Sequence, residues 1–173
     1  MKSIALLALA SLSTAAFAGH PMTAPAGSHT YVPQEAYFGE TELQLDVYGA
    51  YSSTDGEHGT GYGGGLGLNY YFTRNFGLGV DATLVEGRRH EVLETTLSFL
   101  ARYPFEIGHI ALAPYVKVGL GMEIESTAES VLDVGGGIEW RINSRVGFFT
   151  EGTYNFAHDN DYLQIRTGLR FVF

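Results

Sequence analysis

The segment Tyr162-Leu-Gln-Ile-Arg-Thr-Gly-Leu-Arg-Phe-Val-Phe173 alternates between two kinds of side chain. Every odd position from Leu163 to Phe173 holds an apolar or neutral residue, while Gln164, Arg166, Gly168 and Arg170 lie between them. A period of two residues is that of a β-strand, whose successive side chains point to opposite faces. The segment is therefore predicted to be a strand with one apolar and one polar face. Because the sequence stops on this strand, we expect no soluble domain after it.

The first eighteen residues have the composition of an export signal. Lys2 precedes an apolar run over residues 4–17, and Ala16-Phe17-Ala18 has the small-x-small pattern of a cleavage site. The run is too short to be a membrane-spanning helix. We therefore expect cleavage after Ala18. Residues 19–41 contain three of the five prolines and show no periodicity, so we interpret them as an irregular N-terminal extension.

Composition excludes several classes of function. The chain has no cysteine, so it has no disulfide, thiolate metal site or cysteine nucleophile. Without Lys2, nine Lys and Arg stand against nineteen Asp and Glu, a formal charge of −10. Nucleic acid is not an expected partner, because a phosphate backbone requires a basic face. No apolar stretch after the signal reaches the ~18 residues of a membrane helix.

From Glu42 onward the alternating pattern recurs in eight segments. Each has at least the ~9–11 residues that a tilted strand needs to cross a membrane. The segments lie at 42–52, 61–72, 76–86, 91–103, 109–124, 129–142, 146–156 and 162–173. Domain boundaries are thus expected at 1–18, 19–41 and 42–173.

Each segment has an apolar face and a polar face. The apolar faces hold Leu43, Leu45, Val47, Leu66, Leu68, Leu78, Val80, Leu97, Phe99, Val116, Val118, Leu132, Val134, Phe148 and Leu169, among others. The polar faces hold Gln44, Asp46, Asn69, Asp81, Thr96, Ser98, Arg102, Lys117, Asp133, Glu139, Arg141, Glu151 and Asn155, among others. This alternation alone fits a membrane barrel and also a soluble barrel with its apolar face inside.

Three features favour the membrane barrel. Short turns at 73–75, 104–108 and 143–145 alternate with mostly longer, more acidic loops at 53–60, 87–90, 125–128 and 157–161. Inward glycines such as Gly65 and Gly77 suit a narrow barrel of eight strands. Aromatic residues gather at both strand ends, as interfacial girdles require. They are Phe72, Phe76, Tyr103, Trp140, Phe148, Phe171 and Phe173 at the turn end, and Tyr51, Tyr62, Tyr154 and Phe156 at the loop end.

On these features, residues 42–173 resemble the small eight-stranded outer-membrane β-barrels, the family of the outer membrane protein A transmembrane domain and outer membrane protein X. The terminal Leu169, Phe171 and Phe173 are similar to the C-terminal signal that the barrel assembly machinery reads in that family. The resemblance implies an all-β, up-and-down antiparallel transmembrane barrel in the outer membrane of a two-membraned bacterium. It implies lipid and lipopolysaccharide as surroundings and names no surface partner. A peptidoglycan-binding domain after the barrel, and hence a tethering role, is not expected.

The polar faces predict a charged lumen. Charges removed from bulk water need partners, so we expect a cross-strand network of ion pairs. Its expected members are Glu139, Arg141, Glu151, Arg166, Arg170, Arg102, Lys117 and Asp133, with Glu42, Asp46, Asp81, Glu94 and Glu123 also facing inward. We interpret this network as a structural filling of the lumen. A narrow gated pore is the alternative, and a soluble barrel that binds an apolar ligand is a second one.

Signals for other chemistry are weak. The stretch from Ser52 to His58 holds a serine, acids and a histidine, but closeness within one loop is not a catalytic geometry. Glu57-His58, His90-Glu91 and His158 to Asp161 match no defined metal site. The glycine pattern at 59–64 precedes an alternating strand rather than a helix, so it predicts no dinucleotide site. We expect no enzyme activity, cofactor or metal, and a bulge or ladder break at Pro114.

Overall fold

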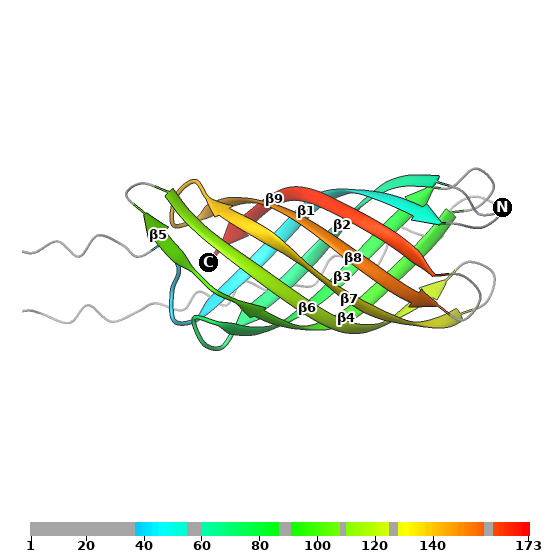
Figure 1. The fold of residues 1–173 in the computed structure, drawn as a ribbon, viewed down its shortest axis with the longest axis horizontal. Helices are drawn as coiled ribbons and strands as arrows, with labels where there is room; N and C mark the ends of the chain where they lie inside the picture. Colours follow the sequence, from blue (N-terminus) through cyan, green and yellow to red (C-terminus); the bar gives the residue numbers. More distant parts are fainter. Residues whose placement is uncertain (1–36, 55–59, 87–90, 108–109, 125–127, 158–160) are drawn as a thin grey trace, which may run out of the picture. The chain divides into compact units, whose positions relative to one another are not determined.

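The computed structural model describes residues 37–54, 60–86, 91–107, 110–124, 128–157 and 161–173. These residues form antiparallel strands joined in chain order (Figure 1). The strands are β1 (Glu42–Thr54), β2 (Thr60–Tyr71), β3 (Phe76–Glu86), β4 (Glu91–Arg102), β5 (Phe105–Ile107), β6 (Ile110–Ile124), β7 (Ala128–Arg141), β8 (Val146–Ala157) and β9 (Tyr162–Val172). No helix among the described residues is long and apolar enough to cross a membrane.

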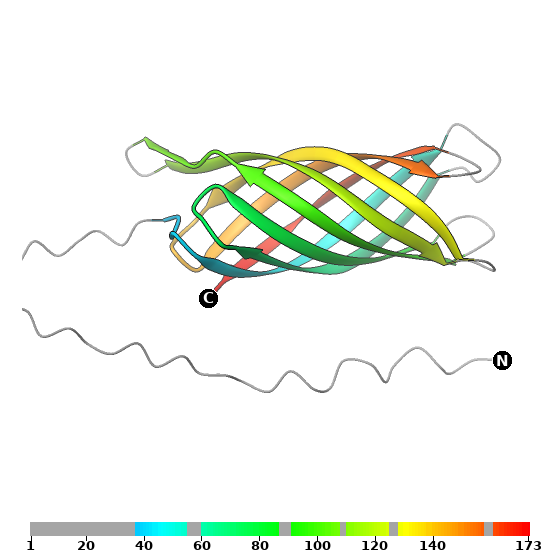
Figure 2. The ribbon, with the colours of Figure 1, turned by 90° about the horizontal axis from the view of Figure 1, so that it is seen from below.

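The sheet closes on itself. The first strand, β1, pairs with the last, β9, from Gln44 opposite Val172 to Thr54 opposite Tyr162. The other strands pair with their neighbours in the chain, except that β4 pairs with β6 rather than with β5. The tilted strands therefore enclose a lumen. One end, the turn end, holds the turns at residues 73–75 and 143–145, and the opposite end, the loop end, holds the end of β1 and the start of β2 (Figures 1 and 2). This is the predicted eight-stranded up-and-down barrel, closed by the β1–β9 and β4–β6 pairings.

One predicted turn is wrong. Residues 104–108 were expected to form a tight connection, but Phe105–Ile107 form the short strand β5. The residues of β5 pair with Leu112, Ala111 and Ile110 of β6, which extends one side of the wall beyond the end of β4. Three residues are too few to show a periodicity, so the sequence pattern gave no sign of this strand.

Pro114 lies at the junction between β4 and β5. Its pairing with Ile138 of β7 is continuous, so no bulge forms on that side. On the other side, the partner of β6 changes from β5 at Leu112 to β4 at Tyr115, and the Tyr103 amide donates to the Pro114 carbonyl (2.9 Å). The expected ladder break is therefore on this side only. Proline's missing N–H falls where the neighbouring strand is itself interrupted.

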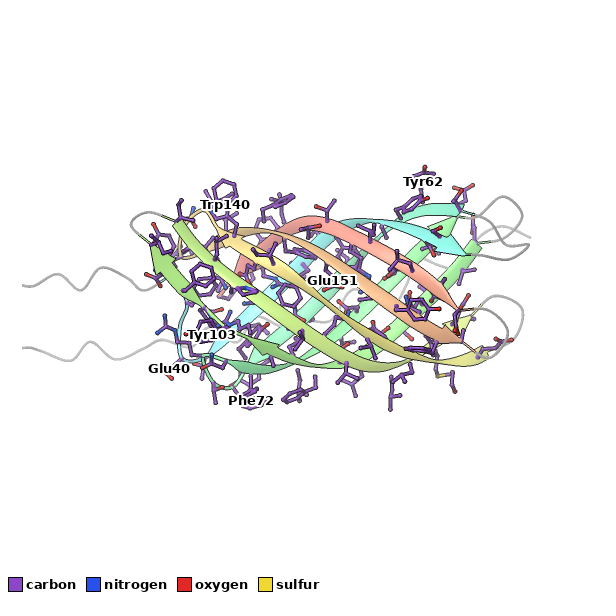
Figure 3. All side chains as sticks on the ribbon, in the orientation of Figure 1. Glu40, Tyr62, Phe72, Tyr103, Trp140 and Glu151 are labelled. Atoms are coloured by element: carbon purple, nitrogen blue, oxygen red, sulfur yellow. The ribbon has the colours of Figure 1, made fainter. Side chains whose placement is uncertain are left out.

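The apolar faces point outward. Leu68, Val118 and Leu169 are each at least 40% exposed, whereas Glu139 and Arg166 are at most 1% exposed. Of the aromatic residues, Phe72, Tyr103 and Trp140 project from the turn end and Tyr62 from the loop end (Figure 3). This orientation is opposite to that of a soluble barrel, so the barrel has no apolar lumen in which to hold an apolar ligand.

Two inward tyrosines explain why glycine is required opposite them. Tyr48 lies across from Gly65, and Tyr71 lies across from Gly77. A Cβ at Gly65 would lie 2.6 Å from the Tyr48 hydroxyl, and one at Gly77 would lie 3.0 Å from the Tyr71 ring. The narrow lumen therefore accommodates each ring only over a residue without a side chain.

Candidate functional site

The lumen contains charged and polar side chains that come from every one of the eight barrel strands. All eight residues expected in the network are at most 7% exposed, as are Glu42, Asp46, Asp81 and Glu94. Glu123 is only half-buried, at the loop end. Figure 3 shows Glu151 midway along the barrel. The lumen is the candidate site, because buried charges are unfavourable unless they pair with one another.

At the turn end, Glu42 is shared by two arginines. Arg102 Nη1 and Arg141 Nη2 donate to Glu42 Oε2 at 2.8 Å and 2.7 Å. The Gln44 amide donates to the same oxygen (2.8 Å), and Arg141 Nε donates to Glu139. One carboxylate from β1 thus connects β4 and β7 across the lumen.

Next to this cluster, Arg170 bridges two carboxylates. Its Nε and Nη2 donate to the two oxygens of Asp46 at 2.7 Å and 2.6 Å, and its Nη1 donates to Glu139 (2.8 Å). Asn69 also donates to Asp46 (2.8 Å). The paired bonds to Asp46 are the bidentate geometry that makes arginine–carboxylate pairs strong. The Phe149 ring lies 4.8 Å from the Arg170 guanidinium.

Midway along the barrel, Lys117 is surrounded by three carboxylates. Its Nζ lies 3.1 Å from Asp81, 3.2 Å from Glu151 and 3.3 Å from Asp133. Arg166 approaches Glu151 at 3.4 Å and Asp81 at 3.5 Å. Two cations therefore serve three acids here, and an ammonium suits this role because it has three donors.

Toward the loop end, acids outnumber cations. Glu94 accepts from Gln164 (3.0 Å) and from Arg166 (3.4 Å). In the sheet register Glu94 lies opposite Glu123, which lies opposite Glu129. Several buried polar atoms in this half have no hydrogen-bond partner within the described part of the chain. They are Thr153 Oγ1, both oxygens of Asp133 and both amide atoms of Asn155, whereas Gln44 Oε1, Ser98 Oγ and Arg102 Nη2, nearer the turn end, have no hydrogen-bond partner among the described residues.

The lumen has little free space. A cavity between Asp46, Asp81, Lys117, Glu151 and Arg166 has room for about one water molecule. No group of three or more His, Cys, Asp or Glu residues in the described ranges is placed to hold a metal ion. The arrangement therefore supplies ion pairs between strands rather than a ligand pocket.

The sequence interpretation missed Phe38. It lies in the segment expected to be irregular, yet it is 2% exposed and its ring faces the guanidinium groups of Arg141 (4.7 Å) and Arg102 (5.2 Å). The only available signal was the aromatic pair Tyr37-Phe38 shortly before Glu42, which belongs to no periodic pattern.

Other candidate residues lie apart from the lumen. Leu169 and Phe173 face outward, Phe171 is partly buried, and Phe173 exchanges backbone hydrogen bonds with Leu43 (2.9 Å and 3.4 Å). Ser52 is buried on the inward face of β1. Residues 55–58 and the histidines at 90 and 158 lie outside the described residues, as do the expected signal and most of the extension.

Solved structures share this fold at low sequence identity. The N-terminal β-barrel domain of Pseudomonas aeruginosa OprF has a TM-score of 0.59 at 15% identity, covering 76% of this chain and 97% of that one. Neisserial surface protein A has a TM-score of 0.55 at 15% identity, covering 78% and 98%. The outer membrane protein OprG of Pseudomonas aeruginosa has a TM-score of 0.53 at 10% identity, covering 76% and 95%.

The chain has the fold of the small outer-membrane β-barrels. No protein-family model and no curated protein matches it. At these identities the likeness concerns the fold, and a fold hosts many functions. What this outer-membrane-type barrel does must therefore be argued from its own outer surface and lumen.

Proposed function

We propose that the protein is a non-catalytic barrel of a bacterial outer membrane that presents its loop end to the exterior and whose lumen is a structural ion-pair core. The observation that carries this is the inversion of polarity across the wall. Leu97 and Leu120 are 59% and 71% exposed, whereas Arg141, Arg166 and Arg170 are at most 2% exposed. Lipid is a suitable environment for the exposed apolar side chains, and the buried arginines are stabilised by pairing with carboxylates.

Orientation and partners follow from the same proposal. Short turns face the periplasm and longer loops face outward in such barrels, where lipid and lipopolysaccharide surround the wall. Export would require removal of residues 1–18, and the terminal Leu169, Phe171 and Phe173 would engage the assembly machinery. A surface partner would meet the loop end. The lumen, filled by side chains, would not conduct ions.

Fractionation with protease shaving tests location and orientation. A protease site is inserted in the loop at 55–59 in one variant and in the turn at 73–75 in a matched variant. Both proteins should enter the outer-membrane fraction and show heat-modifiable mobility, and protease added to intact cells should cut the loop variant alone. Recovery in the soluble periplasm, or cleavage of the turn variant alone, would contradict the proposal.

Conductance in a planar bilayer tests the filled lumen. We expect no discrete openings from the purified barrel, because paired side chains cross the lumen at several levels. Reproducible openings of uniform size would support the narrow pore instead. An equimolar large porin in the same bilayer system serves as the positive control.

A further inference from the structure

The Phe38 side chain fills a space of the size of one aromatic ring at the turn end of the lumen. The ring packs on Ala111 and Ala113, two successive inward residues of β6 that are completely buried. Small residues at both positions leave the space that the ring fills. Ala111 also pairs with Glu106 of β5, so the extension of the wall by β5 and β6 forms the side of the barrel against which Phe38 packs.

Charged groups hold the ring from other sides. The guanidinium carbons of Arg141 and Arg102 lie 4.7 Å and 5.2 Å from its centroid, within the range of cation–π attraction. Arg141 Nη1 donates to the Tyr37 carbonyl (3.2 Å), and the Gly39 amide donates to Glu42 (2.5 Å). The segment is therefore joined to the same Glu42 that bridges the two arginines.

We propose that residues 37–41 are a plug that closes the turn end of the lumen. Phe38 is the docked residue of the plug, and it packs against the side chains of Ala111, Ala113, Arg102 and Arg141. Residues 37–41 lie outside the strands. The plug is thus held by side-chain contacts, whereas the barrel is held by its closed ladder. Release of the plug exposes the turn-end ion pairs to water and leaves the barrel folded.

The absence of cysteine allows a direct test. A single cysteine replaces Ala113 beneath the plug, and its reaction with a charged, water-soluble maleimide is timed in the folded, detergent-solubilised protein. We expect slow reaction with Phe38 in place and a rate about tenfold or more higher after Phe38→Ala, since loss of a buried phenyl contact weakens docking by at least that factor. Ala111→Cys provides a second reporter in case the added sulfur at 113 disturbs the ring.

Three comparisons decide the result. Ser52→Cys, a near-isosteric reporter on the inward face at the loop end, should react at the same rate with and without Phe38→Ala. Phe38→Tyr should keep the Ala113→Cys reporter protected, and Phe38→Leu should protect it less, because leucine has no ring for the guanidinium groups. The plug would be contradicted if the maleimide reaction rate at Ala111→Cys and at Ala113→Cys did not depend on residue 38. It would also be contradicted if Phe38→Ala accelerated the reaction at Ser52→Cys as much as at the turn-end reporters.

Discussion

Buried charges are paired differently in the half of the lumen nearer the turn end (the turn half) and in the half nearer the loop end (the loop half). In the turn half, Glu42, Asp46 and Glu139 face Arg102, Arg141 and Arg170, three acids to three arginines, and each acid accepts at least two hydrogen bonds. In the other half, the described cations that face Asp81, Glu94, Asp133 and Glu151 are Lys117 and Arg166.

This difference indicates where the barrel is rigid and where it is tolerant. A balanced network of ion pairs loses much when one member is removed, because the remaining charges stay buried and unpaired. A half with surplus acid loses less when an acid is neutralised, because fewer carboxylates then share the two cations. Variants that make the same chemical change in each half therefore test this difference.

The largest effect is expected at Arg170. Arg170→Met removes the arginine partner of Asp46 and one of the two arginine partners of Glu139, and should lower the free energy of unfolding by about 3–5 kcal/mol. Urea unfolding in detergent measures it. Arg74→Met is the matched control, because the Arg74 side chain is 43% exposed and 3.8 Å from Glu106, an exposed pair worth about 0.2–1 kcal/mol. Similar losses in the two variants would show that the turn-half network contributes little.

Much of this architecture could be predicted, because closure of a membrane barrel imposes a strict period of two. All eight barrel strands begin and end within two residues of the predicted limits, and every charged residue expected in the network faces inward. The pairings could not be predicted, since they depend on register and on long side chains that reach past neighbouring strands. Arg170 meets Asp46 because β9 pairs with β1 with those two residues opposite. Phe38 and β5 have no periodicity that could mark them.

The next largest effect is expected at Lys117. Lys117→Met should cost about 2–3 kcal/mol, less than the Arg170 variant, because Arg166 still contacts Asp81 and Glu151. Urea unfolding in detergent measures this cost beside that of Arg170→Met. A cost as large as that of Arg170→Met would contradict the difference between the two halves.

A matched pair of neutralised acids follows in size. Asp46→Asn loses the two-bond pairing with Arg170 and should cost about 1.5–3 kcal/mol, the range for hydrogen bonds to charged groups. Asp133→Asn removes one negative charge from the acidic half, where neither oxygen of Asp133 accepts a hydrogen bond from a described residue, and should cost less than about 1 kcal/mol. Urea unfolding of the two variants compares them directly. Equal costs would contradict the division of the lumen.

The smallest effect is expected at Asn155, which has a counterpart in Asn69. Asn69→Leu breaks a 2.8 Å bond to Asp46 and should cost about 1–3 kcal/mol, because it leaves a buried carboxylate with one donor fewer. Asn155→Leu removes an amide that no described residue satisfies and should leave the unfolding free energy within about 1 kcal/mol of the parent value. A cost at Asn155 as large as that at Asn69 would mean that bound water or the loops satisfy this amide. The loop half would then be a hydrated network.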